Sequence, residues 1–301
     1  LNLAGGGDGA WLSYGNGPDP ATFRTEHSAV YNSNLNTMVI FGGYYYNTLN
    51  DTWSVNLSNF SWTQIGQVSP PPERRGHSAI FKLKPGWEVD NGMYIFGGST
   101  LSGSTYYNDV WKLKSDGTTW VEIPTTSCDN SYPQKRVRHS AIYDPVRDEM
   151  LIFSGIREGD ILLDDMWLFK TSVNLNYMWC SIPSSSPSPA ARWGHSAIYS
   201  PNVPLQGENE IRNMMVIFGG NSKVFGVNGI IFDDTWGKPV SEDSTSPVWY
   251  QFVPIDGIKP PARYGHTAIY DPVYQRMLVF GGNTVSQGLQ NDVWEMKFIN
   301  E

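Results

Sequence analysis

The chain has 301 residues, a formal net charge of −8 and an aromatic content of 14%, with 30 glycines and 20 prolines. Its lysines and arginines form no run or stripe, which argues against nucleic acid as a partner. No apolar stretch approaches the ~20 residues that span a membrane, so we expect no insertion into a bilayer. The composition indicates many short strands joined by tight turns, in one all-β domain.

The first predicted element is a short strand at residues 10–14, which reads Ala10-Trp11-Leu12-Ser13-Tyr14. A linker rich in Gly, Asn and Pro follows it up to residue 20. Tryptophan and tyrosine favour the extended backbone of a strand, and the linker residues favour a turn.

A pattern of four parts occurs five times in the chain. The first part is Arg, two residues, His, Ser or Thr, and Ala, and its copies hold all five histidines of the chain: Arg24/His27, Arg74/His77, Arg136/His139, Arg192/His195 and Arg263/His266. The second part is an apolar run that ends in Phe and two small residues: 41–43, 96–98, 153–155, 218–220 and 280–282. Both parts predict β-strands, because the apolar runs are short and end at glycine or serine.

The third part is Asn or Asp, then Asp, any residue and Trp: Asp51/Trp53, Asp109/Trp111, Asp165/Trp167, Asp234/Trp236 and Asp292/Trp294. The fourth part is another Trp in a short β-prone run: Trp11, Trp62, Trp120, Trp179 and Trp249. A four-part signal with paired glycines that recurs roughly every fifty to seventy residues indicates a repeat architecture with one propeller blade for each copy.

These four parts together resemble the Kelch repeat, and the resemblance covers nearly the whole chain. It implies an all-β β-propeller of five four-stranded antiparallel Kelch blades around a central channel. We label the strands of each blade a to d from the centre outward. Strand a then carries His-Ser-Ala, strand b ends in Gly-Gly, strand c holds Asp-x-Trp, and strand d holds the second Trp.

The order of the parts predicts a single domain over residues 1–301 and also how its ring closes. The expected blades span about 21–65, 72–123, 134–182, 190–252 and 261–301. The last blade ends on strand c at Trp294, while residues 10–14 provide a spare strand of type d. We therefore expect the N-terminal segment to supply the outer strand of blade five, which limits exposed strand edges.

Residues that occur in every blade are expected to be structural, because a residue that is the same five times cannot mark one site. This applies to the five histidines and to the aspartates of Asp-x-Trp. The repeated arginines are less clear, because the resemblance places them near the channel mouth, where arginines of protein-binding Kelch domains line the ligand pocket: Arg24, Arg74, Arg136, Arg192 and Arg263. Their presence in all five blades favours a structural role. We assign no catalytic residue, no metal and no cofactor.

Function is expected where the blades differ, namely at the residue after each Arg and in the loop after each small pair. The family topology places both sets on one face. The candidate binding residues are Tyr44, Arg75, Ser99, Arg157, Trp193, Asn221, Tyr264 and Asn283. Exposed Tyr, Trp and Arg around a concavity are typical of binding surfaces. The alternative for any one aromatic residue is packing against a neighbouring loop.

Three functions fit this pattern. The first is a non-enzymatic binding or scaffold module that recognises a protein, or else a glycan, through the loop face around the channel. The second is a carbohydrate-active enzyme, an epimerase or hydrolase, that uses Arg75, Glu158 and Asp160. The third is a spacer in a larger surface protein. No catalytic motif favours the enzyme.

Two further features concern the compartment. Kelch arrays of secreted bacterial proteins resemble this chain in their Tyr-Asp-Pro-Val turns, at 143–146 and 270–273, and lysine is scarce; both favour an extracellular location. Cys128 and Cys180 could form one disulfide, but two separate thiols are the expected state, because two cysteines do not by themselves imply a bond.

Overall fold

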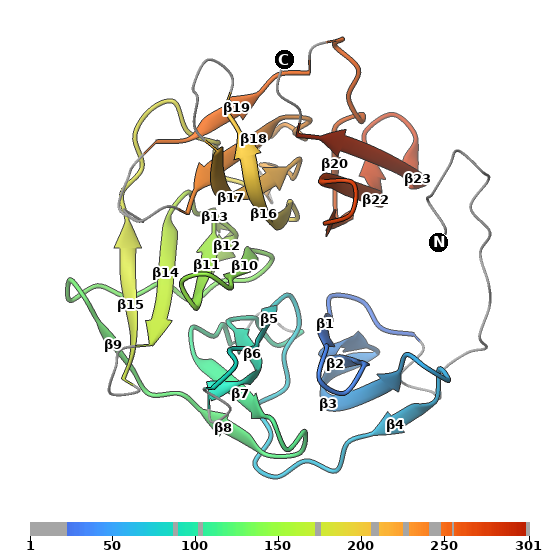
Figure 1. Cartoon of the computed structure of the whole chain (residues 1–301), viewed down its shortest axis with the longest axis vertical. Helices are drawn as coiled ribbons and strands as arrows, with labels where there is room; N and C mark the ends of the chain where they lie inside the picture. Colours follow the sequence, from blue (N-terminus) through green and yellow to red (C-terminus); the bar gives the residue numbers. More distant parts are fainter. Residues whose placement is uncertain are drawn as a thin grey trace.

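The structure is a computed structural model that describes residues 23–86, 90–101, 105–171, 176–205, 211–224, 229–240, 248–254 and 256–298. In these ranges the regular structure is β-strand, and no helix is long and apolar enough to cross a membrane. Figure 1 shows five sheets set around one axis. The predicted five-bladed antiparallel propeller is thereby confirmed. The proposed closing strand at residues 10–14 lies outside the described residues.

The first two blades have the expected four strands in sequence order. Blade one consists of β1 (Ser28–Asn32), β2 (Thr37–Tyr45), β3 (Asn47–Asn56) and β4 (Trp62–Gln64). Blade two consists of β5 (Ser78–Lys82), β6 (Gly92–Phe96), β7 (Val110–Lys114) and β8 (Trp120–Glu122).

Blade four keeps this plan, whereas blades three and five vary it. Blade three consists of β10 (Ser140–Asp144), β11 (Glu149–Phe153), β14 (Met166–Thr171) and β15 (Tyr177–Ile182), with a separate hairpin of β12 (Ile156–Arg157) and β13 (Ile161–Leu162) between β11 and β14. Blade four consists of β16 (Ser196–Pro204), β17 (Ile211–Phe218), β18 (Thr235–Pro239) and β19 (Tyr250–Phe252). Blade five consists of β21 (Thr267–Asp271), β22 (Arg276–Thr284) and β23 (Gly288–Lys297), and β20 (Arg263–Tyr264) pairs with the far end of β22.

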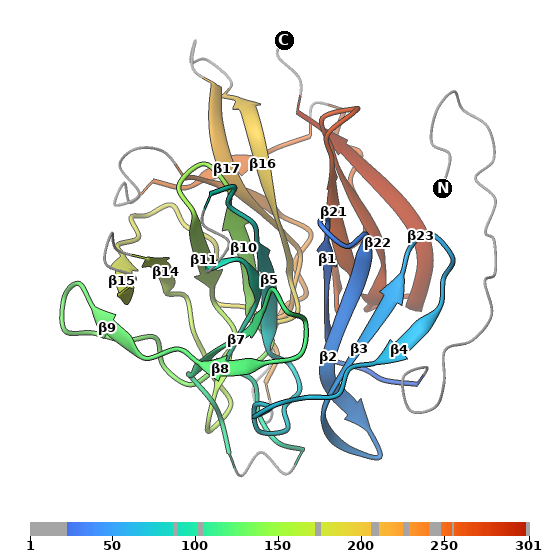
Figure 2. The same cartoon turned by 60° about the horizontal axis from the view of Figure 1, so that its bottom comes forward.

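The strands run across the thickness of the ring. Strands β1, β5, β10 and β16 lie toward its centre, and β4, β8, β15 and β19 lie at its rim (Figure 1). In the tilted view of Figure 2, the strands of blades one, four and five run from one face toward the other. Each strand a therefore begins at one face, which we call the loop face, and ends at the opposite face.

The hydrophobic core consists of layers between blades. Strand b contains a continuous apolar run that ends in Phe, and this run is buried because both of its sides are covered, as in β6 and β11. Phe41 of blade one packs with Met93 and Ile95 of blade two, and three further layers join the following pairs of blades. Blades two, three and four also send a strand d Trp to the strand b Phe of the preceding blade, with ring centroids 4.8–5.0 Å apart.

The paired glycines at the end of strand b permit a close approach of backbone. At Gly98 the φ angle is +101°, and a Cβ atom would lie 3.0 Å from the Arg75 carbonyl oxygen. A Cβ on Gly97 would lie 2.8 Å from the carbonyl oxygen of Arg136 in the next blade. Glycine is needed here because an L side chain would meet backbone that cannot move aside.

The repeated histidines connect neighbouring blades, which agrees with the structural role expected for them. In four cases His Nε2 forms a hydrogen bond of 2.7–2.9 Å with the strand a Ser of the preceding blade: Ser28–His77, Ser78–His139, Ser140–His195 and Ser196–His266. These four imidazoles are buried and pack edge-on against the preceding blade's Phe. His27 of blade one is exposed, and no such bond is formed by it in the described part of the chain.

Burial and the neighbouring arginine lower the pKa of these imidazoles, to about 3 for His77, to about 4 for His266 and well below 6.5 for His139 and His195. The unfolded chain therefore binds more protons than the folded protein below pH 6.5. Stability must fall as the pH falls through this range.

We expect the free energy of unfolding to decrease between pH 6.5 and 5 by up to about 1.4 kcal/mol per pH unit for each of the four histidines. Urea titrations at several pH values measure this slope. The variant H139Q should reduce the slope by about a quarter, since one of four such groups is removed. A stability that does not change between pH 7 and 5 would contradict neutral, buried imidazoles.

The layer between blades five and one differs from the other four. Ile269 is 61% exposed, whereas Ile80, Ile142 and Ile198 at the same strand position are buried. Val293 is also 48% exposed. Among the described residues, no core layer of the kind found at the other seams joins blade five to blade one.

The closing strand at residues 10–14 therefore stays a prediction. If it completes blade five, W11A should lower the free energy of unfolding by about 3 kcal/mol, because a Trp between two blades is removed. Thermal and urea melts measure this change. Deletion of residues 1–8 is the control, since it leaves the predicted strand intact. Equal stability of W11A and the parent chain would rule the closure out.

Blade three carries an additional outer strand. The linker after blade two forms β9 (Thr125–Ser127), which pairs in parallel with β15. Because Ser127 lies opposite Trp179, the next residue, Cys128, comes beside Cys180, with 5.1 Å between the Cα atoms. The two cysteines form a disulfide, so the expectation of two separate thiols was wrong. The sequence did not indicate that the linker adds to the sheet.

Candidate functional site

The repeated arginines do not line the centre of the loop face. Arg74, Arg136, Arg192 and Arg263 are fully buried, and Arg24 is nearly so. The expectation of channel-mouth arginines is thereby corrected. Each guanidinium lies inside its own blade and donates to protein acceptors there, although Arg24 Nε is buried without an acceptor among the described residues. These groups are therefore not available to a ligand.

The same contacts recur in each blade. Arg192, for example, binds both oxygens of Asp234, and its Nη1 also donates to the Gly219 carbonyl oxygen at 2.9 Å. Over the five blades the Arg–Asp hydrogen bonds measure 2.6–3.0 Å. The Asp also accepts from the indole Nε1 of Asp-x-Trp at 2.6–2.7 Å. The hydrogen bonds from Arg263 hold the pKa of Asp292 at about 2.

The variable residues do share one face, because they pair with one another in each blade. The residue after Arg forms an antiparallel bridge with the residue after the small pair: Thr25 with Tyr44, Arg75 with Ser99, Val137 with Ile156, Trp193 with Asn221, and Tyr264 with Asn283. Ser99 and Asn221 are buried in these bridges. Tyr44, Arg75, Arg157, Trp193, Tyr264 and Asn283 remain partly exposed.

Side chains at these positions form a continuous series of contacts across all five blades. Arg75 lies over the Tyr44 ring at 5.7 Å and is paired with Glu26 at 3.4 Å. Glu26 also accepts from Arg138 Nε at 3.0 Å. We call this series the mouth arc and define it as Tyr44, Arg75, Glu26, Arg138, Trp193, Tyr264 and Asn283.

The second half of the mouth arc is aromatic. The Arg138 guanidinium lies 4.9 Å from the centroid of Trp193, and Trp193 packs edge-on against Tyr264 with 5.0 Å between centroids. Asn283 donates to the Tyr264 hydroxyl at 3.2 Å. Each ring thus has a fixed neighbour, which reduces the entropy lost when a ligand is bound.

Glu26 and Arg138 were missed by the sequence analysis. Both lie two residues after the repeated Arg, where blades two, four and five have Gly76, Gly194 and Gly265. Candidate residues were predicted from the position directly after Arg and not from the second position after it. The sequence did contain a signal for them: two copies of the repeat have a charged residue at a position where the other three have glycine.

The carboxylates predicted for an enzyme lie in one loop of blade three. Arg157, Glu158 and Asp160 lie on the β12–β13 hairpin, and the two carboxylates are exposed. In the ranges that the structure describes, neither carboxylate forms an ion pair within 4.0 Å with Arg75.

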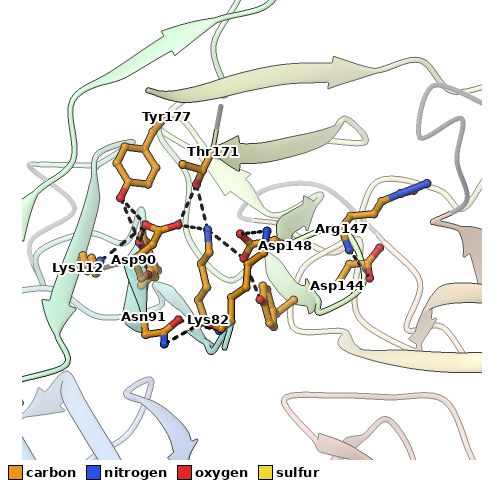
Figure 3. Close-up of polar contacts among 12 residues, drawn as sticks. Lys82, Asp90, Asn91, Lys112, Asp144, Arg147, Asp148, Thr171 and Tyr177 are labelled. Carbon is orange, nitrogen blue, oxygen red and sulfur yellow. Dashed lines mark hydrogen bonds and ion pairs between the residues drawn. The ribbon is translucent and has the colours of Figure 1, made fainter. Parts of the chain in front are cut away.

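A second polar cluster lies at the opposite face, between blades two and three (Figure 3). Lys82 at the end of β5 is paired with Asp90, and it binds Asp148 at 3.0 Å and the Thr171 hydroxyl at 3.0 Å. Asp90 also accepts from the hydroxyl of Tyr177 and lies 3.7 Å from Lys112 Nζ. We call this group the lysine clamp.

The lysine clamp is a structural link. Lys82, Asp90 and Lys112 are buried and come from blade two, whereas Thr171 and Tyr177 belong to blade three. Burial lowers the pKa of Lys112 to about 8, although Asp90 opposes this shift. Because the buried lysines and carboxylates neutralise each other, the clamp joins the blades without an uncompensated charge.

Within the described residues, no group of three or more His, Cys, Asp or Glu side chains could hold a metal ion. Four of the five histidines use Nε2 for the link to the preceding blade. The mouth arc is therefore the group of partly exposed side chains that most resembles a binding site, and its chemistry is aromatic and cationic.

Comparison with known proteins gives a consistent family match. The family model described as the KLHDC2/KLHL20/DRC7 Kelch-repeats domain matches residues 10–205 and 89–236. An F-box/kelch-repeat protein of Arabidopsis thaliana is 26% identical over 228 residues, which is 74% of this chain and 42% of that protein. Kelch repeat-containing protein 2 of Saccharomyces cerevisiae is 24% identical over 249 residues, which is 80% of this chain and 25% of that protein.

The solved structure of YjhT superposes on 92% of this chain and 82% of its own, with a TM-score of 0.68 and 13% identity, and so supports the fold alone. Kelch domain-containing protein 1 of Mus musculus is 29% identical over 65% of this chain and 40% of its own length. The chain thus spans less than half the length of these three curated relatives.

Variants of the adjacent residues Arg74 and Arg75 test whether the first is structural and the second belongs to the surface. R74M should lower the free energy of unfolding by about 3 kcal/mol or more, because Asp109 loses its buried counter-charge. R75M should change it by about 1 kcal/mol or less, because its ion pair is partly solvated. Urea melts of both variants measure the difference, and equal effects would contradict the assignment.

Proposed function

Because this chain belongs to the KLHDC2/KLHL20/DRC7 Kelch-repeats domain family, we propose that it is a non-enzymatic module that binds a partner protein through its loop face. One observation carries the proposal: the contacts of the mouth arc run unbroken from Tyr44 of blade one to Asn283 of blade five. Rigid aromatic side chains and arginines are the residues that contribute most to protein interfaces.

The position of the mouth arc supports this function further. Its backbone is fixed by the bridges between the two variable positions of each blade, so the surface exists before a partner arrives. The tips of the surrounding loops between strands b and c carry exposed apolar side chains, among them Tyr46, Leu101, Ile161 and Ile230. These exposed apolar side chains add contact area around the charged and aromatic residues of the mouth arc.

The three alternative functions have less support. A glycan would also stack on aromatic rings, but the mouth arc contains charged groups in addition, namely Arg75, Glu26 and Arg138. The carbohydrate-active enzyme would need Glu158 or Asp160 beside an arginine, and no contact in the described residues favours this. A role as a spacer would not explain why the contacts of the mouth arc are continuous across the blades.

The Cys128–Cys180 disulfide supports an oxidising compartment for this module. Disulfides persist in secreted and cell-surface proteins and are rare where thiol reductants are abundant. The bond fastens the strand added to blade three, and Cys128 is exposed, so a reducing compartment would have access to it. We therefore favour export of the protein, in agreement with its low lysine content.

The double variant W193A/Y264A tests the proposal. Once a partner has been captured and identified, the variant should bind it at least about 10-fold more weakly, because two central aromatic contacts are lost. Isothermal titration measures the affinity. The control is Y31A, which removes an exposed tyrosine at the opposite end of β1. Unchanged affinity of the double variant, with an unchanged melting temperature, would refute binding through the mouth arc.

A further inference from the structure

Two of the five turns that begin strand a break the repeat in the same place. The residue two positions after the repeated Arg has a φ angle between 54° and 66° in every blade. Blades two, four and five meet this need with glycine, whereas blade one has Glu26 and blade three has Arg138. A left-handed backbone is unfavourable for any residue with a side chain of this kind, so the two exceptions call for an explanation.

The ring itself imposes this backbone conformation. Peptide groups at these positions form hydrogen bonds from blade to blade around the centre of the loop face. Gly76 N donates to Glu26 O at 2.9 Å, and Arg138 N donates to Gly76 O at 2.7 Å. Gly194 and Gly265 continue the series at 3.1 and 2.7 Å. The conformation of Glu26 and Arg138 is thus a requirement of the fold, but their charged side chains are not.

The two exceptional side chains meet each other. Glu26 accepts from Nε and Nη2 of Arg138, across 112 residues of sequence and across the whole of blade two. Blade two offers only Gly76 at this position, and a Cβ there would lie 3.5 Å from Arg138 Cγ. Because Gly76 has no side chain, space remains at blade two for the contact between Glu26 and Arg138.

The same carboxylate also binds a second arginine. Arg75 Nη1 lies 3.4 Å from the other Glu26 oxygen, so one negative charge is shared by two positive ones. Tyr44 and Trp193 lie against the two guanidinium groups and fix them. Arg75 Nε is buried and has no hydrogen-bond acceptor among the described residues. All three charged side chains remain between 24% and 33% exposed, so solvent and ligands can reach them.

This arrangement has the form of an anion site that already holds an anion. Arginines fixed by aromatic rings bind carboxylates well, since their planar donors match the two oxygens. We propose that Glu26 is an internal occupant of a carboxylate site built by Arg75 and Arg138, and that an acidic side chain of the partner displaces it. The inference rests on the proposed protein-binding function and adds the chemistry of the contact at the centre of the mouth arc.

A role as internal occupant has a consequence that a purely structural role lacks. Removal of the Glu26 charge frees both arginines and should improve the binding of an external carboxylate. Removal of Arg138 should abolish that binding. If Glu26 instead served only to hold the turns together, its replacement would lower the stability of the protein and would not raise its affinity for an external carboxylate.

The probe is a fluorescein-labelled, capped pentapeptide, Gly-Ser-Glu-Ser-Gly amide, with matched peptides that carry Gln or phosphoserine in place of Glu. Fluorescence anisotropy at low salt measures its binding to the full chain. We expect E26Q to bind the Glu peptide at least about fivefold more tightly than the parent chain, and to bind the Gln peptide no better than the parent does. R138G, which restores the glycine of the other blades, should bind no Glu peptide.

The control variant is E73Q, which removes an exposed negative charge next to Arg74. If E73Q gains as much affinity as E26Q, the effect is one of overall charge and the proposal fails. It also fails if E26Q gains no affinity, loses melting temperature, or prefers the phosphoserine peptide. These outcomes leave the proposed function standing as long as W193A/Y264A still loses its protein partner.

Discussion

The structure depends on one interaction that occurs in every blade, the buried pair between the repeated Arg and the Asp of Asp-x-Trp. The guanidinium joins the start of strand a to the start of strand c, and its Nη1 also holds the end of strand b through a carbonyl oxygen. The Trp indole donates to the same Asp. A buried charge pair is tolerated when further hydrogen bonds satisfy both partners, and each blade provides them.

The links between blades extend this local unit into a ring. The second small residue after strand b donates its N–H to the carbonyl oxygen of the next blade's Arg, as Gly98 does to Arg136 at 2.9 Å. The His–Ser hydrogen bonds and the Phe–Trp contacts also join neighbouring blades. Blade three has Ser154 in place of the first glycine, and its hydroxyl donates to Leu163 O and Arg192 O. The substitution therefore adds hydrogen bonds where the others have only close contact.

The candidate site consists of residues that differ from blade to blade, beside the residues that every blade shares. The repeated arginines are buried and each is bound to an Asp of its own blade, which explains why they are not ligand groups. The residues after each Arg and after each small pair are held together by the bridges, which places Tyr44, Trp193 and Tyr264 at equivalent positions of their blades. Glu26 and Arg138 were missed because the other three blades have glycine at this position, and only the φ angle shows that these two charged residues adopt the same left-handed backbone.

The sequence alone determined the number of blades, the order of their strands and the structural role of the repeated His and Asp, whereas it left the repeated Arg between a structural role and a place at the channel mouth. Each of these depends on local signals that recur five times, and recurrence reveals what the fold requires of every unit. Only the tertiary structure decided that Glu26 meets Arg138, that Lys82 binds Thr171 and that Cys128 is bonded to Cys180. Such contacts join residues from different blades that occur once, and their existence depends on how neighbouring sheets are rotated and spaced, which no local pattern encodes.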